Sequence, residues 1–217
     1  MLLRRLAAAA LLAISAPSLA CTVAPGYRVP NSFQLAEAAD LIVIARVEGQ
    51  RAGTRSHESK IVLEPVGVLK GVPPIRPLML DGWLERTRVA GTALPRATRS
   101  DPAELVESNP DALMGGCTRY IFARGMTLVL FYKRGSRALH FMNYPFARVS
   151  EDVPSTTSRW VQAVREYVVI SRLRAAARRE AVRRRADVLG RGTGDQRAIA
   201  ADMRRLLATR DALLPVR

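Results

Sequence analysis

The sequence is poor in the residues that build most catalytic and metal sites. Its 217 residues include two cysteines and two histidines. His57 and His140 lie in no His-Glu-x-x-His or Cys-x-x-Cys context. There is also no Gly-x-Ser-x-Gly elbow and no phosphate-binding loop of the Gly-Lys-Ser/Thr type. The sequence therefore predicts a protein that is not an enzyme and that uses no metal or cofactor.

Long apolar runs are absent after the first twenty residues, and lysine is rare. No later segment reaches the roughly 18 uninterrupted apolar residues that a transmembrane helix needs. Lysine and arginine together number 34 against 19 acidic residues, a net charge of +15, yet only Lys60, Lys70 and Lys133 are lysines. An arginine bias can follow from GC-rich coding, so the charge alone is weak evidence for nucleic-acid binding. With 48% hydrophobic residues, the composition indicates a globular protein.

The first twenty residues have the pattern of a secretory signal peptide. Two arginines precede a nine-residue apolar core over 6–14, and small residues occupy Ser18 and Ala20, the minus-three and minus-one positions of a cleavage site. We expect the mature protein to begin at Cys21 and to be secreted or periplasmic. The alternative is a lipoprotein lipidated at Cys21, although lipoprotein signals usually carry leucine where this chain has Ser18.

Export changes what the two cysteines indicate. In an oxidising compartment an even pair is most simply a disulfide, and Cys21 and Cys117 allow one connectivity. A bridge that closes so long a loop stabilises the fold by about 4–5 kcal/mol in the chain-entropy model. The alternative is two free thiols.

The mature chain begins with a strand-rich part. A short helix is expected over 32–40, with Asn31 as its cap and Gln34 placed to complete a capping box. Pro65 and Gly67 favour a bend or bulge inside one strand. Residues 83–116 are expected to form a long loop with at most one helical turn. The expected strands are 41–47, 60–71, 78–80, 126–132 and 137–142.

From Ser155 onward the apolar period becomes helical. Trp160, Val164, Tyr167, Val168 and Ser171 form one stripe that can dock on the strands, with Val161 and Val169 beside it. A last helix, capped by Asp195, is expected to carry Ile199, Met203, Leu206 and Leu207 on one stripe.

Five arginines between these two helices point all round an ideal helix, so this segment is predicted to be solvated. Such a surface can contact phosphates or lipid headgroups without reading a nucleotide sequence. The alternative is a solvated helix with no ligand. The candidate anion-binding residues are Arg178, Arg179, Arg183, Arg184 and Arg185.

The elements together predict a mainly β fold with flanking helices. Because strands and helices do not alternate, a closed OB-like β-barrel followed by a helical tail fits better than a parallel sheet. The expected organisation is a signal peptide over 1–20, a barrel domain over 21–150, and a docked helix with a basic helical tail over 151–217.

A resemblance to a known superfamily rests on scattered matches over about residues 21–145. These are Cys21 at the mature terminus, Ala-Ala-Asp-Leu-Ile-Val-Ile-Ala-Arg-Val at 38–47, Val-Leu-Lys-Gly at 68–71, and Cys117 followed by Phe122, Gly125 and Leu-Val-Leu-Phe at 128–131. Together they resemble the netrin-module and tissue-inhibitor-of-metalloproteinases superfamily, whose members are OB-fold barrels with flanking helices.

The resemblance implies a way to inhibit zinc proteases. In the family's inhibitors the amino group and carbonyl of the terminal cysteine chelate the protease zinc, and the next residue enters the specificity pocket. Cys21 and Thr22 match that start, and an α-amine with its own carbonyl makes a sound five-membered chelate. The chain departs from the family at Val23, where the inhibitors have a cysteine, and it lacks their further disulfides.

The function expected from the sequence is that of an exported, non-catalytic binding or interaction protein. The alternatives are a metalloprotease inhibitor acting through Cys21 and Thr22, and a lipoprotein held at a membrane. The sequence does not identify the partner; the two candidates are a secreted zinc metalloprotease and an anionic envelope surface. Sequence-specific nucleic-acid binding is not expected, because Phe131, Tyr132 and Phe141 lie in runs too apolar for a stacking platform.

Overall fold

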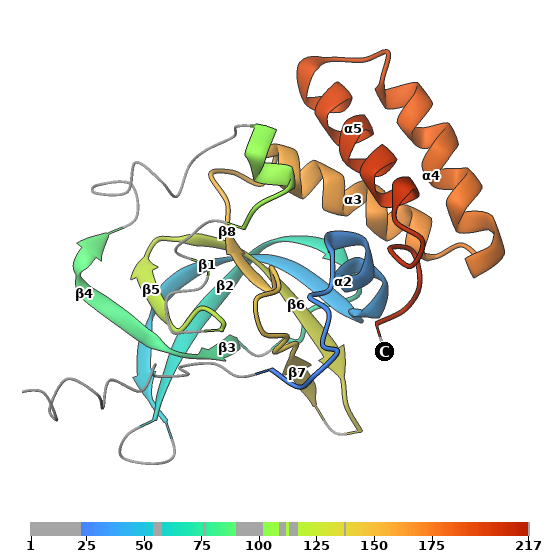
Figure 1. Cartoon of the computed structure of the whole chain (residues 1–217). Coiled ribbons are helices and arrows are strands. Elements are labelled where there is room, and N and C mark those ends of the chain that lie inside the picture. The colour runs from blue at the N-terminus through green and yellow to red at the C-terminus, as the bar shows by residue number, and fades with distance from the viewer. Residues whose placement is uncertain are drawn as a thin grey trace, which may run out of the picture.

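A computed structural model describes residues 23–53, 58–75, 77–89, 102–108, 112, 117–136 and 138–216. An antiparallel sheet forms its middle, and helices cover one side of that sheet (Figure 1). The elements are α2 (Ser32–Ala38), β1 (Leu41–Ala52), β2 (Ser59–Lys70), β3 (Leu78–Asp81), β4 (Trp83–Val89), the 3-10 helix η2 (Pro102–Leu105), β5 (Ile121–Arg124), β6 (Thr127–Arg134), β7 (Leu139–Phe141), β8 (Ser150–Asp152), α3 (Arg159–Ser171), α4 (Ala175–Leu189) and α5 (Gly194–Ala208).

The prediction of a closed OB-like barrel is wrong. The six-stranded sheet has the order β3-β2-β1-β6-β7, with β8 also pairing with β6, and in the described residues it does not close. The remaining strands, β4 and β5, form a separate parallel pair. On the face away from the helices, Phe122 and Ala123 of the separate β4–β5 pair help to fill the core, so the sheet does not need to close on itself to cover that face. The fold is mixed α/β.

The central strand β1 is buried on both faces, as its apolar run predicts. Ile42 and Ile44 face the helices, while Leu41, Val43 and Ala45 face a second core on the other side of the sheet. That second core also contains side chains from β2, β3, β5 and β6. The sheet therefore lies between two apolar cores.

Most strands in the first half of the chain follow the prediction. The strands expected over 41–47, 60–71 and 78–80 are β1, β2 and β3, and the expected hairpin is β6–β7. The bend near Pro65 and Gly67 is confirmed as a register shift, because Ile44 pairs with Gly67 and Ala45 pairs with Pro65. The strands β4, β5 and β8 were not predicted, and β4 lies inside the segment expected to be loop.

Side-chain caps start two of the helices. Asn31 caps α2 through the predicted capping box, in which its Oδ1 accepts from Gln34 N at 2.9 Å. The cap of α5 is Thr193, whose hydroxyl accepts from Gln196 N. Asp195 was the predicted cap, but its carboxylate instead accepts from Arg159 Nε and Nη2 at 2.9 and 2.8 Å.

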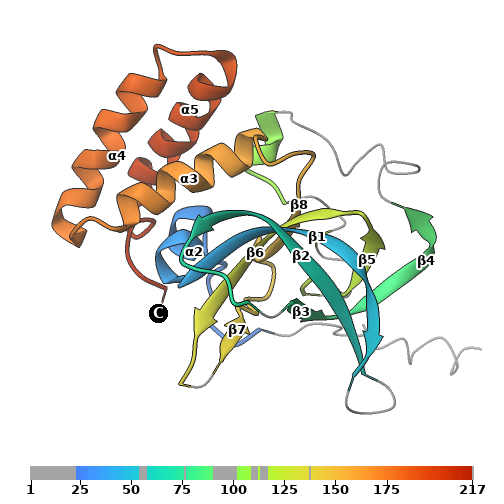
Figure 2. The same ribbon diagram turned by 180° about the vertical axis from the view of Figure 1, so that it is seen from behind.

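The arginine-rich segment 178–185 packs against the rest of the fold, so the prediction that it is solvated is wrong. Both ribbon views place α3 between the sheet and the α4–α5 pair (Figures 1 and 2). On α4, Arg178, Val182, Ala186 and Leu189 are buried and lie within about 80° of one another on an ideal helix. One apolar core runs from α2 and the sheet through α3 into α4 and α5.

The stripe predicted for α3 is confirmed at its buried positions. Trp160, Val164, Tyr167 and Val168 all lie in the helix-side core. Val169, which the sequence placed beside that stripe, is 62% exposed. Within the described residues, no helix combines the length and apolar character needed to cross a bilayer.

Candidate functional site

The residues expected to contact a protease lie outside the described part of the chain. Cys21 and Thr22 are not described, so zinc chelation by this terminus stays a prediction. Cys117, the one described cysteine, is half-buried in the loop before β5 and is not a free thiol, and its carbonyl accepts from Phe146 N at 2.6 Å. The bridge between Cys21 and Cys117 also stays a prediction.

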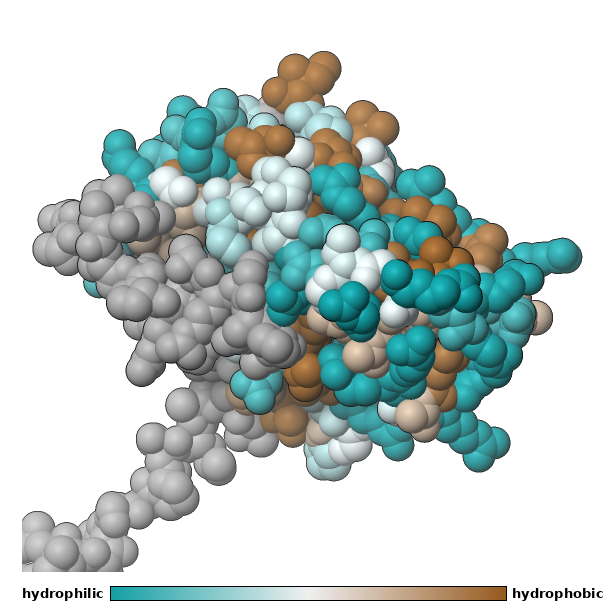
Figure 3. Space-filling model, turned by 90° about the horizontal axis from the view of Figure 1, so that it is seen from above, coloured by the Kyte–Doolittle hydropathy of each residue, from teal (hydrophilic) through white to brown (hydrophobic). Residues whose placement is uncertain are grey.

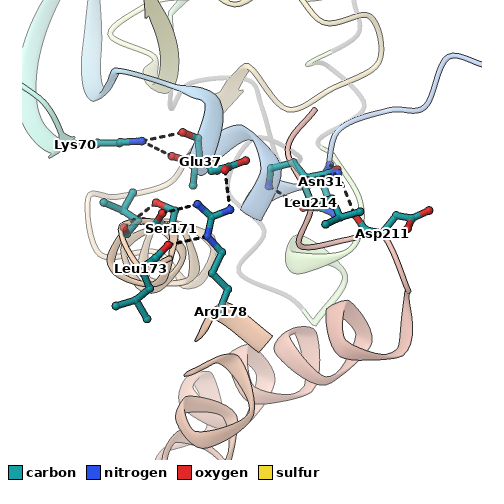
Figure 4. A network of polar contacts seen from close by, with 11 residues as sticks. Asn31, Glu37, Lys70, Ser171, Leu173, Arg178, Asp211 and Leu214 are labelled. Carbon is teal, nitrogen blue, oxygen red and sulfur yellow. Dashed lines mark hydrogen bonds and ion pairs between the residues drawn. The ribbon is translucent and has the colours of Figure 1, made fainter. Parts of the chain in front are cut away.

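Arg178, the first of the five candidate anion-binding arginines, is buried (Figure 4). It donates from Nη1 to Glu37 Oε1 at 2.7 Å, and from Nε and Nη2 to the carbonyls of Leu173 and Ser171, each at 3.0 Å. Its guanidinium carbon also lies 5.9 Å from the ring centre of Phe33. The side chain thus ties α4 to α2 and to the end of α3, and it does not belong to an exposed surface.

The segment that follows α5 returns to the same helix α2. Asn31 Nδ2 donates to Ala212 O at 3.0 Å, and Gln34 Nε2 donates to Leu214 O at 3.1 Å. On the other side of α2, Lys70 Nζ donates to the carbonyls of Ala36 and Glu37 (Figure 4). Burial lowers the pKa of Lys70. Both α4 and the segment after α5 are therefore fastened to α2.

The other four arginines point in different directions. Arg179 donates to Leu207 O, while Arg183 and Arg184 lie beside Glu180 on their own helix. Arg185 makes a bidentate pair with Glu166 of α3, at 2.7 and 2.5 Å. That carboxylate raises the pKa of Arg185. The five arginines do not converge on one site, and anion binding by the four outer ones stays a prediction.

A groove lies between α3 and α4, in the helical part of the fold formed by α3, α4 and α5. Its volume is about 540 Å³. Its apolar lining comes from Val169, Ile170, Leu173, Ala181 and Val188. Its charged lining comes from Arg165, Glu166, Arg184 and Arg185.

The apolar lining of this α3–α4 groove is open to solvent. Val169 is 62%, Leu173 41% and Val188 51% exposed, whereas Ile170 in the same lining is buried. In the space-filling view from above, patches of hydrophobic side chains lie among hydrophilic ones (Figure 3). Exposed apolar side chains that gather in a hollow and are rimmed by polar ones mark binding surfaces more often than isolated ones do.

The rim of the groove is positively charged. It has three arginines against Glu166, which is already paired with Arg185. The exposed Arg165 and Arg184 are therefore two positive charges in excess of the carboxylates in the lining, and Arg184 also lies 4.0 Å from Glu180 outside the lining. Arginine is common in protein interfaces because its planar fork binds carboxylates in a bidentate way.

A second hollow, of about 430 Å³, lies between the start of α2, η2 and α5. Its polar groups bond to one another, since the Tyr167 hydroxyl donates to Asp202, which also accepts from Arg205. Burial, with the charge of Asp202, raises the pKa of Tyr167 well above its usual value. Phe146 on its wall has a φ of 61°, a conformation rare outside glycine. Three of the polar side chains in this hollow are therefore already paired with one another.

Sequence reasoning missed the groove because it assigned the arginine-rich segment to solvent. The signal was present as Val182, Ala186 and Leu189, a stripe at helical spacing that predicts packing of α4. Once α4 packs, Val188 comes to the same hollow as Val169. The described residues hold no group of three or more His, Cys, Asp or Glu side chains that could bind a metal ion.

Comparison with known proteins assigns the chain to no family. No protein-family model matches it, and no curated protein matches it. The resemblance to the netrin-module and tissue-inhibitor-of-metalloproteinases superfamily therefore stays a prediction.

Proposed function

We propose that this chain is an exported interaction protein whose α3–α4 groove receives a protein partner. The observation that carries the proposal is the exposure of Val169, Leu173 and Val188 in one hollow with an arginine rim. Leaving these side chains in water costs free energy that a docked partner recovers. The signal peptide expected over residues 1–20 supports the export.

The scaffold supports this role because it holds the groove in a preformed shape. The opposite face of α3 is packed in the core through Trp160 and Tyr167, and Arg178 fastens α4 to α2. A rigid surface loses little conformational entropy when a partner docks. The sheet thus acts as the support, and the helices present the binding surface.

Site-specific photo-crosslinking in the native host tests the proposal. A photoreactive amino acid at Val169 should give a discrete cross-linked band with a partner in the exported fraction, and adding Val188→Asp in the same molecule should remove it. The control position is Met79 on β3, which is 52% exposed and outside the groove lining. Equal cross-linking at Met79 and Val169, or none at Val169, would contradict the proposed function.

A further inference from the structure

We infer that the α3–α4 groove binds an acidic amphipathic helix of a partner protein. The inference rests on the proposed function and adds the chemistry of the partner. It is carried by the shape of the groove, by its charge, and by the fixed position of its walls.

The shape of the groove suits a helix. Arg165 to Ile170 on α3 extends about 8 Å, and Ala181 to Val188 on α4 extends about 10 Å, at 1.5 Å per residue. Leu173 lies two residues beyond the end of α3 and lengthens that wall. Two turns of a third helix match this length, with apolar anchors at i, i+3 or i+4, and i+7. Val169, Leu173 and Val188 are the side chains that such anchors would cover.

An extended peptide fits the same walls poorly. Along the groove, the backbone groups of α3 and α4 are already paired within their own helices. The walls therefore offer side chains and no strand edge. An extended segment would leave its own backbone N–H and C=O groups without partners over an apolar lining, whereas a helix satisfies its own.

The charge of the rim sets the chemistry of the partner. Arg165 and Arg184 are exposed at the groove, and Glu166 is already paired with Arg185. Glutamate or aspartate flanking an apolar stripe would meet these guanidinium groups, while lysine would be repelled. An acidic helix is therefore favoured over a basic one.

The same features disfavour two other occupants. In a symmetric dimer formed through this groove, the arginine rim of one copy would face the arginine rim of the other. A bilayer surface is flat, whereas these apolar side chains line a hollow, which a convex surface such as that of a helix fills better. A helix of opposite charge avoids both conflicts.

The experiment uses fluorescence anisotropy of the mature protein with a synthetic helix of about 18 residues, about five turns. The probe carries leucine at i, i+3, i+4 and i+7 and glutamate at the flanking positions. The control peptide replaces each glutamate by lysine. We expect the acidic peptide to bind at least about tenfold more tightly, with affinity falling as salt rises because exposed charges are screened.

Protein variants locate the site. Val169→Asp should abolish binding, and Arg165→Glu or Arg184→Glu should each weaken it about fivefold to tenfold. The matched control is Arg183→Glu, which changes the net charge equally on an exposed α4 residue outside the groove lining. Circular-dichroism melting of each variant checks that the substitution leaves the fold intact.

The outcomes separate the inference from the proposed function. If Val169 cross-links to a partner but the acidic peptide binds no better than the basic one, the inference fails and the proposed function stands. If Arg183→Glu weakens peptide binding as much as Arg184→Glu, the peptide responds to the net charge of the protein and the assignment of binding to the groove is wrong. If the protein binds anionic vesicles instead of the peptide, and Val169→Asp removes that binding, the occupant of the groove is a bilayer and the inference is wrong. If the protein dimerises without binding the peptide, and Val169→Asp prevents dimerisation, the occupant is a second copy of this chain.

Discussion

Replacing Arg178 by alanine removes the side chain that ties α4 to Glu37 of α2. Arg178 is 9% exposed and makes three hydrogen bonds, one of them to the Glu37 carboxylate. The side chain of Glu37 is 16% exposed, so water does not readily replace the lost partner. Removing one member of a buried ion pair costs about 3–5 kcal/mol.

The expected loss lies at the lower end of that range. Lys70 Nζ donates to the backbone carbonyl of Glu37, so a cation remains near the Glu37 carboxylate after the substitution. We expect a loss of about 3 kcal/mol, which corresponds to a fall in Tm of about 6–12 °C for a protein of this size. Arg178→Lys should lose less, because it keeps the charge but not the planar fork that serves three acceptors.

Urea unfolding followed by circular dichroism measures the effect. The matched control is Arg184→Ala, because the side chain of Arg184 is 72% exposed and its nearest carboxylate oxygen is 4.0 Å away. That variant should stay within about 0.5 kcal/mol of the parent protein. The reasoning is refuted if Arg178→Ala is no less stable than Arg184→Ala.

Four further predictions address the rest of the chain. Truncation after Ser171 should abolish cooperative thermal unfolding, because α4 and α5 contribute buried side chains to the helix-side core; a truncated protein that melts like the parent would contradict this. If Cys21 and Cys117 are bonded, the intact mass under non-reducing conditions should be two hydrogen masses below that of the reduced protein, and thiol labelling of the denatured, unreduced protein should modify neither cysteine. If Cys21 chelates a protease zinc, one alanine added before it should abolish inhibition, since the resulting amide nitrogen is no longer a basic donor; no inhibition by the unmodified mature protein across a panel of zinc proteases would eliminate this mechanism. Burial raises the pKa of Tyr132 and Tyr167, so the unfolded chain loses these protons first and stability should fall as pH rises above about 10, with their phenolate absorbance appearing only as the protein unfolds.

Local chemistry was enough to predict several elements. The capping box of Asn31 and Gln34 closes within four residues, and the stripe that begins at Trp160 needs only helical periodicity. The run of β-branched residues in β1 likewise predicts a buried strand without knowledge of its neighbours. Such signals are contained in short windows of sequence, and the structure has them where they were expected.

Strands that depend on distant partners could not be predicted. The strand β8 reads Ser-Glu-Asp, which has no strand-like apolar alternation, yet all three residues are buried. This strand pairs with β6. Its two carboxylates are neutralised by arginines, since the distant Arg119 donates to Asp152 and the nearby Arg148 donates to Glu151. Buried carboxylates are tolerated only with such partners, and sequence spacing does not reveal them.

The export signal and the cysteine pairing remain predictions from the sequence. The sequence by itself determined the main strands and the docked helix, because each of these elements depends on neighbouring residues. The open sheet and the burial of Arg178 were decided by tertiary structure. Charge made the Arg178 segment look solvated, but Glu37, 141 positions earlier in the chain, supplies its partner. The groove arises in the same way, because Val169 and Val188 meet only when two helices pack, and neither helix alone forms a hollow.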